Sequence, residues 1–136
     1  MTLRNRALDL LGEIVRFGQH KPKERERAMF TKRSGDGYTV AAPGVELRTL
    51  AYGERTLMAE FRLAAGHVLP AHAHPHEQTG YLVSGRIRLR IGAESLELAP
   101  GDSWCVPASV EHGADLLEDS VAVEVWSPVR EDLLPR

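Results

Sequence analysis

The alternation of apolar and polar residues in short segments constrains the fold of this chain more than any other feature. In residues 86–91, Ile87, Leu89 and Ile91 alternate with three arginines, and residues 121–126 contain three valines at alternate positions. Neighbouring side chains of a strand point to opposite faces, so each segment forms a strand with one apolar face. Glycines separate such segments about every ten residues, at Gly44, Gly53, Gly66, Gly85, Gly92 and Gly101. The pattern predicts an antiparallel sandwich or barrel with eight or nine strands between Tyr38 and Trp126.

The first part of the chain has a different pattern. Apolar residues recur at helical spacing between Leu3 and Phe17, which predicts a short amphipathic helix. Packing on the domain or a dimer contact is favoured over a membrane-surface helix, because the polar face mixes charges of both signs. A run of mixed charges at 20–27 indicates a solvated linker. We therefore expect three parts: an N-terminal amphipathic helix with a charged linker (1–37), a β-domain (38–130) and a C-terminal tail (131–136).

Composition narrows the functional classes. The 136 residues suffice for one domain with one hydrophobic core, and the formal net charge of −2 offers no field that would attract nucleic acid. No apolar run approaches the roughly 20 residues of a membrane span, and no secretory signal is recognisable, so we expect a cytoplasmic protein with no membrane partner. Cys105 is the only cysteine, which excludes an intrachain disulfide, and we expect it to be a small buried residue.

Histidine is the unusual residue type in this sequence, because four of the six histidines lie within the ten residues 67–76. His72 and His74 are two residues apart, so on an extended chain their rings lie on one face and can converge on one metal ion. A single pair of this kind is a weak signal for a metal site. Gln78 and His112 strengthen the signal, because an amide oxygen and a third imidazole are further ligand groups.

These residues lie in two spacing patterns that resemble the two motifs of the cupin superfamily. The first pattern is Gly66, five residues, His72-x-His74, three residues, Gln78, six residues and Gly85. The second is Gly101, five residues, Pro107 and then Val110-Glu-His112. The resemblance implies an all-β fold, a double-stranded β-helix or jelly-roll cupin barrel. It also implies one divalent transition metal, Ni, Zn, Fe or Mn, held by His72, His74, Gln78 and His112.

The sequence departs from these motifs at three positions. Gln78 stands where many cupins have glutamate. In the second motif, Ser109 stands where a glycine precedes the histidine, and Leu116 replaces the later asparagine. An amide ligand is neutral, so the bound ion would keep its full double charge and polarise a bound oxygen more strongly. The neighbouring Glu77 points away from the metal if the strand stays extended. If the turn before this strand is shifted by one residue, Glu77 becomes the ligand instead of Gln78.

The two remaining histidines of the cluster have different expected roles. His76 lies behind the ligands or on the surface, where it could orient a ligand or assist proton transfer without binding the metal itself. His67 falls at the start of a strand, and we expect it to be structural.

Two longer strings, residues 72–85 and 124–132, resemble the pectin-degradation cupins that open 4,5-unsaturated uronates into linear keto-acids. The resemblance implies that Glu124, Trp126 and Arg130 face the substrate. Arg130 would bind a substrate carboxylate and Glu124 would act as general acid or base, and both are therefore candidate catalytic residues, while Trp126 would bind substrate. Strand alternation places Glu124 and Trp126 on one face but does not say whether that face is the inner one.

Two other functional classes remain open from the sequence. One is an iron-dependent dioxygenase acting on a small aromatic or thiol substrate, since three histidines around an ion would serve it. The other is a non-enzymatic sensor of a sugar acid or a metal, with the N-terminal helix contacting a regulatory partner. In every case we expect a small-molecule ligand, with a carboxylate or sugar acid favoured. We also expect a homodimer, because exposed sheet edges can be covered by a second subunit.

Overall fold

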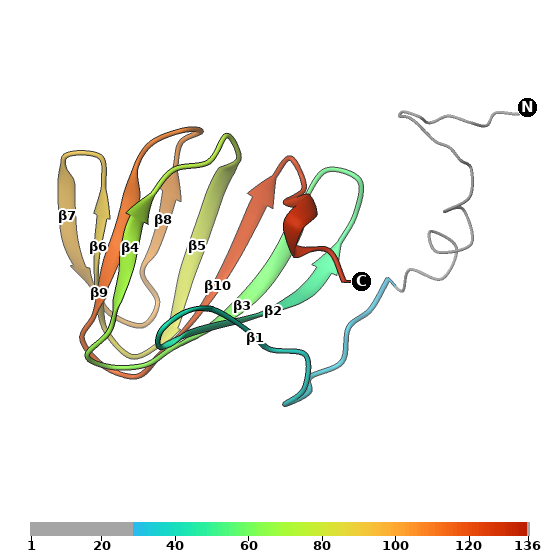
Figure 1. The fold of residues 1–136 in the computed structure, drawn as a ribbon, viewed down its shortest axis with the longest axis horizontal. Coiled ribbons are helices and arrows are strands. Elements are labelled where there is room, and N and C mark those ends of the chain that lie inside the picture. The colour runs from blue at the N-terminus through green and yellow to red at the C-terminus, as the bar shows by residue number, and fades with distance from the viewer. Residues whose placement is uncertain (1–28, 136) are drawn as a thin grey trace, which may run out of the picture. The chain divides into compact units, whose positions relative to one another are not determined.

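Ten strands and one short 3-10 helix make up the part of the chain that the computed structural model describes, residues 29–135 (Figure 1). The strands are β1 (Thr39–Ala42), β2 (Val45–Tyr52), β3 (Leu57–Leu63), β4 (Val68–His72), β5 (Glu77–Ser84), β6 (Ile87–Ile91), β7 (Glu94–Leu98), β8 (Ser103–Val106), β9 (His112–Leu116) and β10 (Ser120–Ser127). The 3-10 helix η1 (Glu131–Leu133) follows β10. The predicted N-terminal helix lies outside the described residues.

The ten strands exceed the eight or nine that the sequence predicts. β1 and β8 contain four residues each, and such short strands do not show enough alternation to be separated from the turns beside them. Within residues 29–135, no helix has the length and apolar character that crossing a membrane requires.

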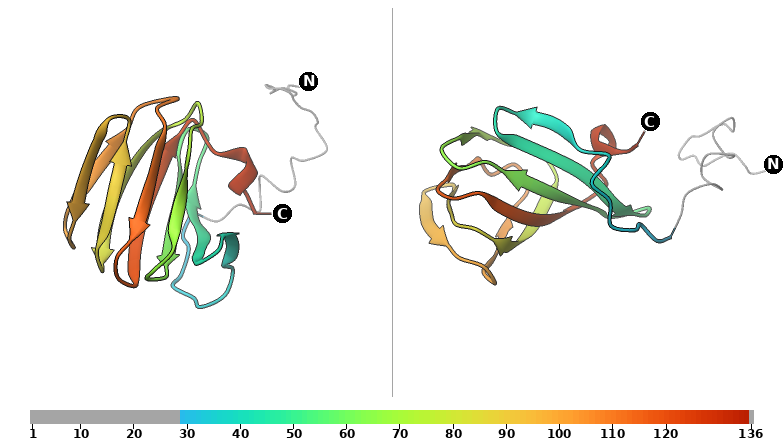
Figure 2. Two further views of the ribbon diagram at one scale, coloured as in Figure 1. Left: turned by 60° about the vertical axis from the view of Figure 1, so that its left-hand side comes forward. Right: turned by 90° about the horizontal axis from the view of Figure 1, so that it is seen from below.

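The strands form two antiparallel sheets that face each other, as the predicted jelly roll requires (Figures 1 and 2). One sheet has the order β1-β2-β3-β10-β5-β8, and the other has the order β4-β9-β6-β7. β10 therefore lies between β3 and β5, and β9 lies between β4 and β6, although these strands are far apart in the sequence. The all-β jelly-roll prediction is confirmed, and its long-range pairings bring residues of both sequence motifs together.

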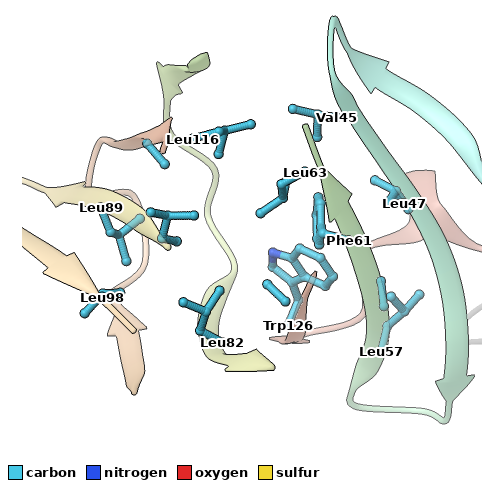
Figure 3. Close-up of a cluster of buried hydrophobic side chains, with 14 residues drawn as sticks. Val45, Leu47, Leu57, Phe61, Leu63, Leu82, Leu89, Leu98, Leu116 and Trp126 are labelled. Carbon is cyan, nitrogen blue, oxygen red and sulfur yellow. The ribbon is translucent and has the colours of Figure 1, made fainter. Parts of the chain in front are cut away.

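The apolar core lies between the inner faces of the two sheets (Figure 3). Trp126 of β10 is only 2% exposed and packs against Phe61 of β3, with ring centroids 6.0 Å apart. Alternate residues of β10 are buried, so Ala122, Glu124 and Trp126 share the inner face. The face of β10 that carries these residues is therefore the inner one, a point that the sequence leaves open. The residues of both neighbouring strands on the same face are buried too.

Two residues near the strand ends show how local sequence shapes the fold. Gly85 ends the β5 segment with a φ of 89°, and an added Cβ would overlap the Ser120 side chain. A residue with a side chain is disfavoured there for both reasons.

The expectation that Cys105 is buried is wrong, since it is exposed. Alternation along β8 buries Val106 and therefore turns the preceding Cys105 outward.

Candidate metal site and adjoining cavity

Three histidines from two distant segments of the chain meet at one end of the jelly roll. His72 ends β4 and lies opposite His112, which begins β9, and His74 lies in the connection from β4 to β5 (Figure 1). The ring centroids of His72 and His112 are 4.2 Å apart, and those of His74 and His112 are 4.9 Å apart. One ligand nitrogen from each of the three histidines lies within 4.8 Å of the other two. This geometry is suited to a shared metal ion.

Backbone carbonyl groups set the tautomer of all three rings. In each histidine Nδ1 lies at hydrogen-bond distance from a carbonyl oxygen two residues away in the chain, which only accepts, so Nδ1 carries the hydrogen. The distances are 2.8 Å from His72 to Pro70, 3.1 Å from His74 to His76 and 2.9 Å from His112 to Val110. Nε2 of each neutral ring therefore keeps its lone pair, and the carbonyls hold the rings in orientations suited to ligation.

The environment of His112 gives a direct test of whether the residues fit a cation. Nε2 of His112 is buried and has no hydrogen-bond partner within the described part of the chain. Burial lowers the pKa of His112, and burial together with the charge of Arg130 lowers that of His74. Both rings are neutral near pH 7, which is the form that binds metals. A divalent ion at the three Nε2 atoms would satisfy the orphaned nitrogen, so these residues fit such an ion.

Gln78 lies beside the histidines, on the inner face of β5. Its side chain is buried and that of Glu77 is exposed, as alternation predicts for an extended strand. Oε1 of Gln78 accepts a hydrogen bond from Nε1 of Trp126 at 2.7 Å and lies 2.9 Å from Nε2 of His74. Two ligands at right angles around one ion, each about 2.1 Å from it, lie about 3 Å apart. The Gln78 oxygen and the His74 nitrogen have the spacing of neighbouring ligands.

Ser109 connects the two loops that carry the histidines. Its backbone N–H donates to the carbonyl oxygen of His74 at 2.8 Å. Its φ of 65° lies in the left-handed region that glycine favours, and the cupin motif has glycine at this position. Ser109 therefore adopts a backbone conformation that a glycine would adopt without strain.

Glu124 is the one buried acidic residue of the described chain, and it lies next to Gln78. Its side chain occupies the inner face of β10 and is 8% exposed. Nε2 of Gln78 donates a hydrogen bond to its Oε1. Burial raises the pKa of Glu124 to about 7, while the Gln78 hydrogen bond and the charge of Arg130 act in the opposite direction. A carboxyl group with this pKa can both accept and donate a proton near neutral pH.

A cavity of about 320 Å³ adjoins these residues. Its polar wall contains His72, Gln78, Glu124, Trp126 and Arg130. Its apolar wall includes Leu47, Phe61, Leu69 and Leu133. The sequence analysis missed this second wall, because its strand residues follow the ordinary alternation of a core and carry no separate signal.

Arg130 already has a carboxylate partner. Its Nε and Nη2 donate to Oδ1 and Oδ2 of Asp132 at 2.9 and 2.6 Å, and its Cζ lies 5.4 Å from the ring centroid of Trp126. The residues expected to form a tail instead include η1, whose Leu133 lines the cavity. Thr49 of β2 donates a hydrogen bond to the Leu133 carbonyl oxygen at 2.5 Å.

The two other histidines of residues 29–135, His76 and His67, lie outside the group of three. The carbonyl oxygen of His76 accepts from His74, and their ring centroids are 5.6 Å apart, so His76 contacts a candidate ligand. Its own Nδ1 is buried without a partner within residues 29–135. The exposed His67 packs its ring beside Gly44, on the chain segment before β4.

Two facing antiparallel sheets with three clustered histidines between their ends define a jelly-roll protein with a candidate metal site. A sequence model of the cupin domain matches residues 59–127, which are 69 of the 136 residues. The chain belongs to the cupin domain family.

Solved structures agree with this assignment. KdgF from Halomonas sp. is 29% identical with a TM-score of 0.74, and the match covers 79% of this chain and 99% of that protein. An RmlC-like cupin from Shewanella frigidimarina NCIMB 400 is 24% identical with a TM-score of 0.69, covering 79% and 100%. The SPY1581 protein of unknown function from Streptococcus pyogenes is 18% identical with a TM-score of 0.58, covering 72% and 93%. The last two show the fold alone. No curated protein matches the chain.

Proposed function

We propose that this cupin binds one divalent transition metal and opens the ring of a small 4,5-unsaturated uronate to a linear keto-acid. His72, His74, His112 and Gln78 would hold the ion. The observation that carries the proposal is the cavity, in which a buried carboxyl group and a guanidinium lie beside the histidine group. The likeness to KdgF and the resemblance of residues 124–132 to uronate-opening cupins support the choice of substrate class.

Glu124 suits the proton transfers of this reaction. The O1–H and C1–O5 bonds of the sugar break and a C1 carbonyl forms. The C4=C5 enol ether becomes a C5 ketone with a new C4–H bond. One proton moves from O1 to C4, and no atom is gained or lost. With a pKa of about 7, Glu124 can take up this proton and return it. A divalent ion, when bound, supplies Lewis-acid polarisation of a sugar oxygen.

The other cavity residues would bind and orient the sugar. Arg130 supplies the positive charge that a uronate carboxylate requires. Trp126 contributes an aromatic surface to the polar wall, and the apolar wall excludes water from the opposite side of the sugar ring. A volume of about 320 Å³ suits a small ligand such as a monosaccharide.

The test is the ultraviolet absorbance of the unsaturated uronate, which disappears when the C4=C5 double bond is lost. We expect turnover by the metal-loaded protein, and at least about 100-fold slower turnover by Glu124→Gln, because a general acid–base group contributes that much or more. His67→Ala is the matched histidine control and should keep the wild-type rate, since His67 lies outside the site.

Absence of turnover by the native, metal-loaded protein would overturn the proposed reaction. Oxygen consumption with bound iron would then favour the dioxygenase. Metal and sugar-acid binding without chemistry would favour the sensor.

A further inference from the structure

The side chain of Arg130 bridges the cavity and a carboxylate outside it. Arg130 lines the cavity, whereas Asp132 is not among the lining residues. The Arg130 side chain is 20% exposed and that of Asp132 is 60% exposed. Arg130 therefore contacts both the cavity and the more exposed Asp132, which binds one edge of its guanidinium.

We propose that Asp132 is a positioning residue that holds the outer edge of Arg130, so that the inner N–H groups of the guanidinium bind the carboxylate of an anionic ligand in the cavity. This inference rests on the proposed function, since it concerns how the same cavity takes a sugar acid.

The hydrogen bonds of Arg130 leave donors free for a ligand. A guanidinium carries N–H donors on Nε, Nη1 and Nη2. Asp132 uses Nε and one hydrogen of Nη2, in the parallel two-bond arrangement that fixes both the distance and the plane of the group. Within residues 29–135 nothing bonds to Nη1. The Nη1 hydrogens are the donors farthest from Asp132 that a second carboxylate can use.

The fold determines where the Asp132 carboxylate lies. The N–H of Leu133 donates to the carbonyl oxygen of Arg130 at 3.0 Å, which closes the turn of η1 around Asp132. The Thr49 hydroxyl fixes the same turn to β2. Trp126 lies beneath the guanidinium. Arg130 is therefore restrained by a carboxylate at its edge and by an aromatic ring at its face, and a ligand meets a preorganised donor group.

Asp132 could instead occupy the place of the ligand carboxylate and compete with it. The two arrangements predict opposite effects of removing the carboxylate. A positioning residue strengthens anion binding, and a competitor weakens it. The position of Asp132 outside the cavity lining and the free Nη1 favour positioning. The Arg130 hydrogen bonds also hold the pKa of Asp132 below its usual value, so Asp132 stays ionised near neutral pH.

The experiment compares three variants of the full, metal-loaded chain. Asp132→Asn removes the charge, Asp132→Glu keeps a carboxylate, and Glu131→Gln is the matched control because Glu131 is an exposed acid on the same turn. The probes are galacturonate, which has a carboxylate but no C4=C5 bond to react, and galactose, its neutral counterpart. Titration calorimetry measures both dissociation constants, and thermal unfolding checks folding. An exposed ion pair contributes little to stability, so we expect the unfolding midpoints to agree within about 3 °C.

We expect Asp132→Asn to weaken galacturonate binding about tenfold and to leave galactose binding within about twofold of the wild-type value. Asp132→Glu should recover most of the lost affinity, and Glu131→Gln should match the wild type. With the unsaturated uronate, KM should rise and kcat should change little. A purely structural role of Asp132 would affect galactose and galacturonate alike.

Unchanged or tighter galacturonate binding by Asp132→Asn would overturn the inference, and tighter binding would identify Asp132 as a competitor. A wild-type protein that binds galacturonate but does not convert the unsaturated uronate refutes the proposed reaction only. In that case the affinity ratio between wild type and Asp132→Asn still decides the role of Asp132. A wild-type protein that binds neither sugar acid overturns both proposals.

Discussion

Replacing Glu124 by glutamine should stabilise the metal-free protein at alkaline pH. The pKa of Glu124 is raised from 4.5 to about 7, chiefly by burial, so the folded state disfavours its ionised form. Between these two values the folded state binds more protons than the unfolded state. Stability therefore falls as the pH rises through this window, and below pH 4.5 the penalty is absent. Glutamine keeps an oxygen that can accept the Gln78 hydrogen bond and has no charge to bury.

The magnitude follows from the size of the pKa shift. Each pKa unit corresponds to about 1.4 kcal/mol, so ionised Glu124 lowers the free energy of unfolding by about 3 kcal/mol above pH 7. The free energy of unfolding of Glu124→Gln, relative to that of wild type, should therefore rise by this amount between pH 4 and pH 8. For a chain of this size, the midpoint of thermal unfolding of the variant should rise by on the order of 10 °C relative to wild type over the same range.

The assay is thermal unfolding of chelator-treated wild type and variant at pH 4, 6 and 8. Taking the difference between the proteins at each pH removes the contributions of His74 and His112, which both proteins share. Glu77→Gln is the matched control, because Glu77 is an exposed acid near the same site. A pH-independent difference between wild type and Glu124→Gln would contradict a raised pKa of the buried Glu124 carboxyl group. Added metal should reduce the pH-dependent gain, since a nearby cation lowers the pKa of a carboxyl group.

Three further predictions follow from the fold and the site. Metal content after dialysis should fall below about pH 6 as the imidazoles become protonated, and full retention at pH 4 would contradict histidine ligation. Gly85→Ala should lower the free energy of unfolding by more than about 3 kcal/mol, since the added Cβ overlaps Ser120. Gly66→Ala places its Cβ in open space and should lose only about 1 kcal/mol from its positive φ. Equal losses in denaturant titrations would contradict the overlap at Gly85. The protein should be a homodimer in solution, and a mass near 15.0 kDa at micromolar concentration by light scattering would show otherwise.

Alternation along the chain predicted the fold class well, because a strand with one buried face shows its period directly. In β6, Ile87 and Leu89 are buried and Arg88 is exposed, as their pattern indicates. The same argument could not orient β10, since Glu124 and Trp126 share one face with Ala122 while three valines occupy the other. Only the pairing of β10 with β3 and β5 turns the glutamate inward.

The residues that the sequence did not indicate are those that depend on a turn or on distant strands. Asp132 pairs with Arg130 across two residues in a segment without periodicity, so it was assigned to a tail. Leu69 and Leu133 line one cavity although 64 residues separate them. The sequence predicts a small buried Cys105, whereas its register in β8 turns it outward.

Metal titration of the wild type and its histidine variants shows whether the three histidines bind an ion. After chelator treatment, calorimetry with Ni²⁺ or Zn²⁺ should show one ion per chain for the wild type. His112→Ala should weaken binding far more than His76→Ala, because His112 offers a buried free Nε2 to the ion while His76 only contacts His74. Failure of the wild type to bind either ion, or equal losses in the two variants, would contradict the assigned metal site.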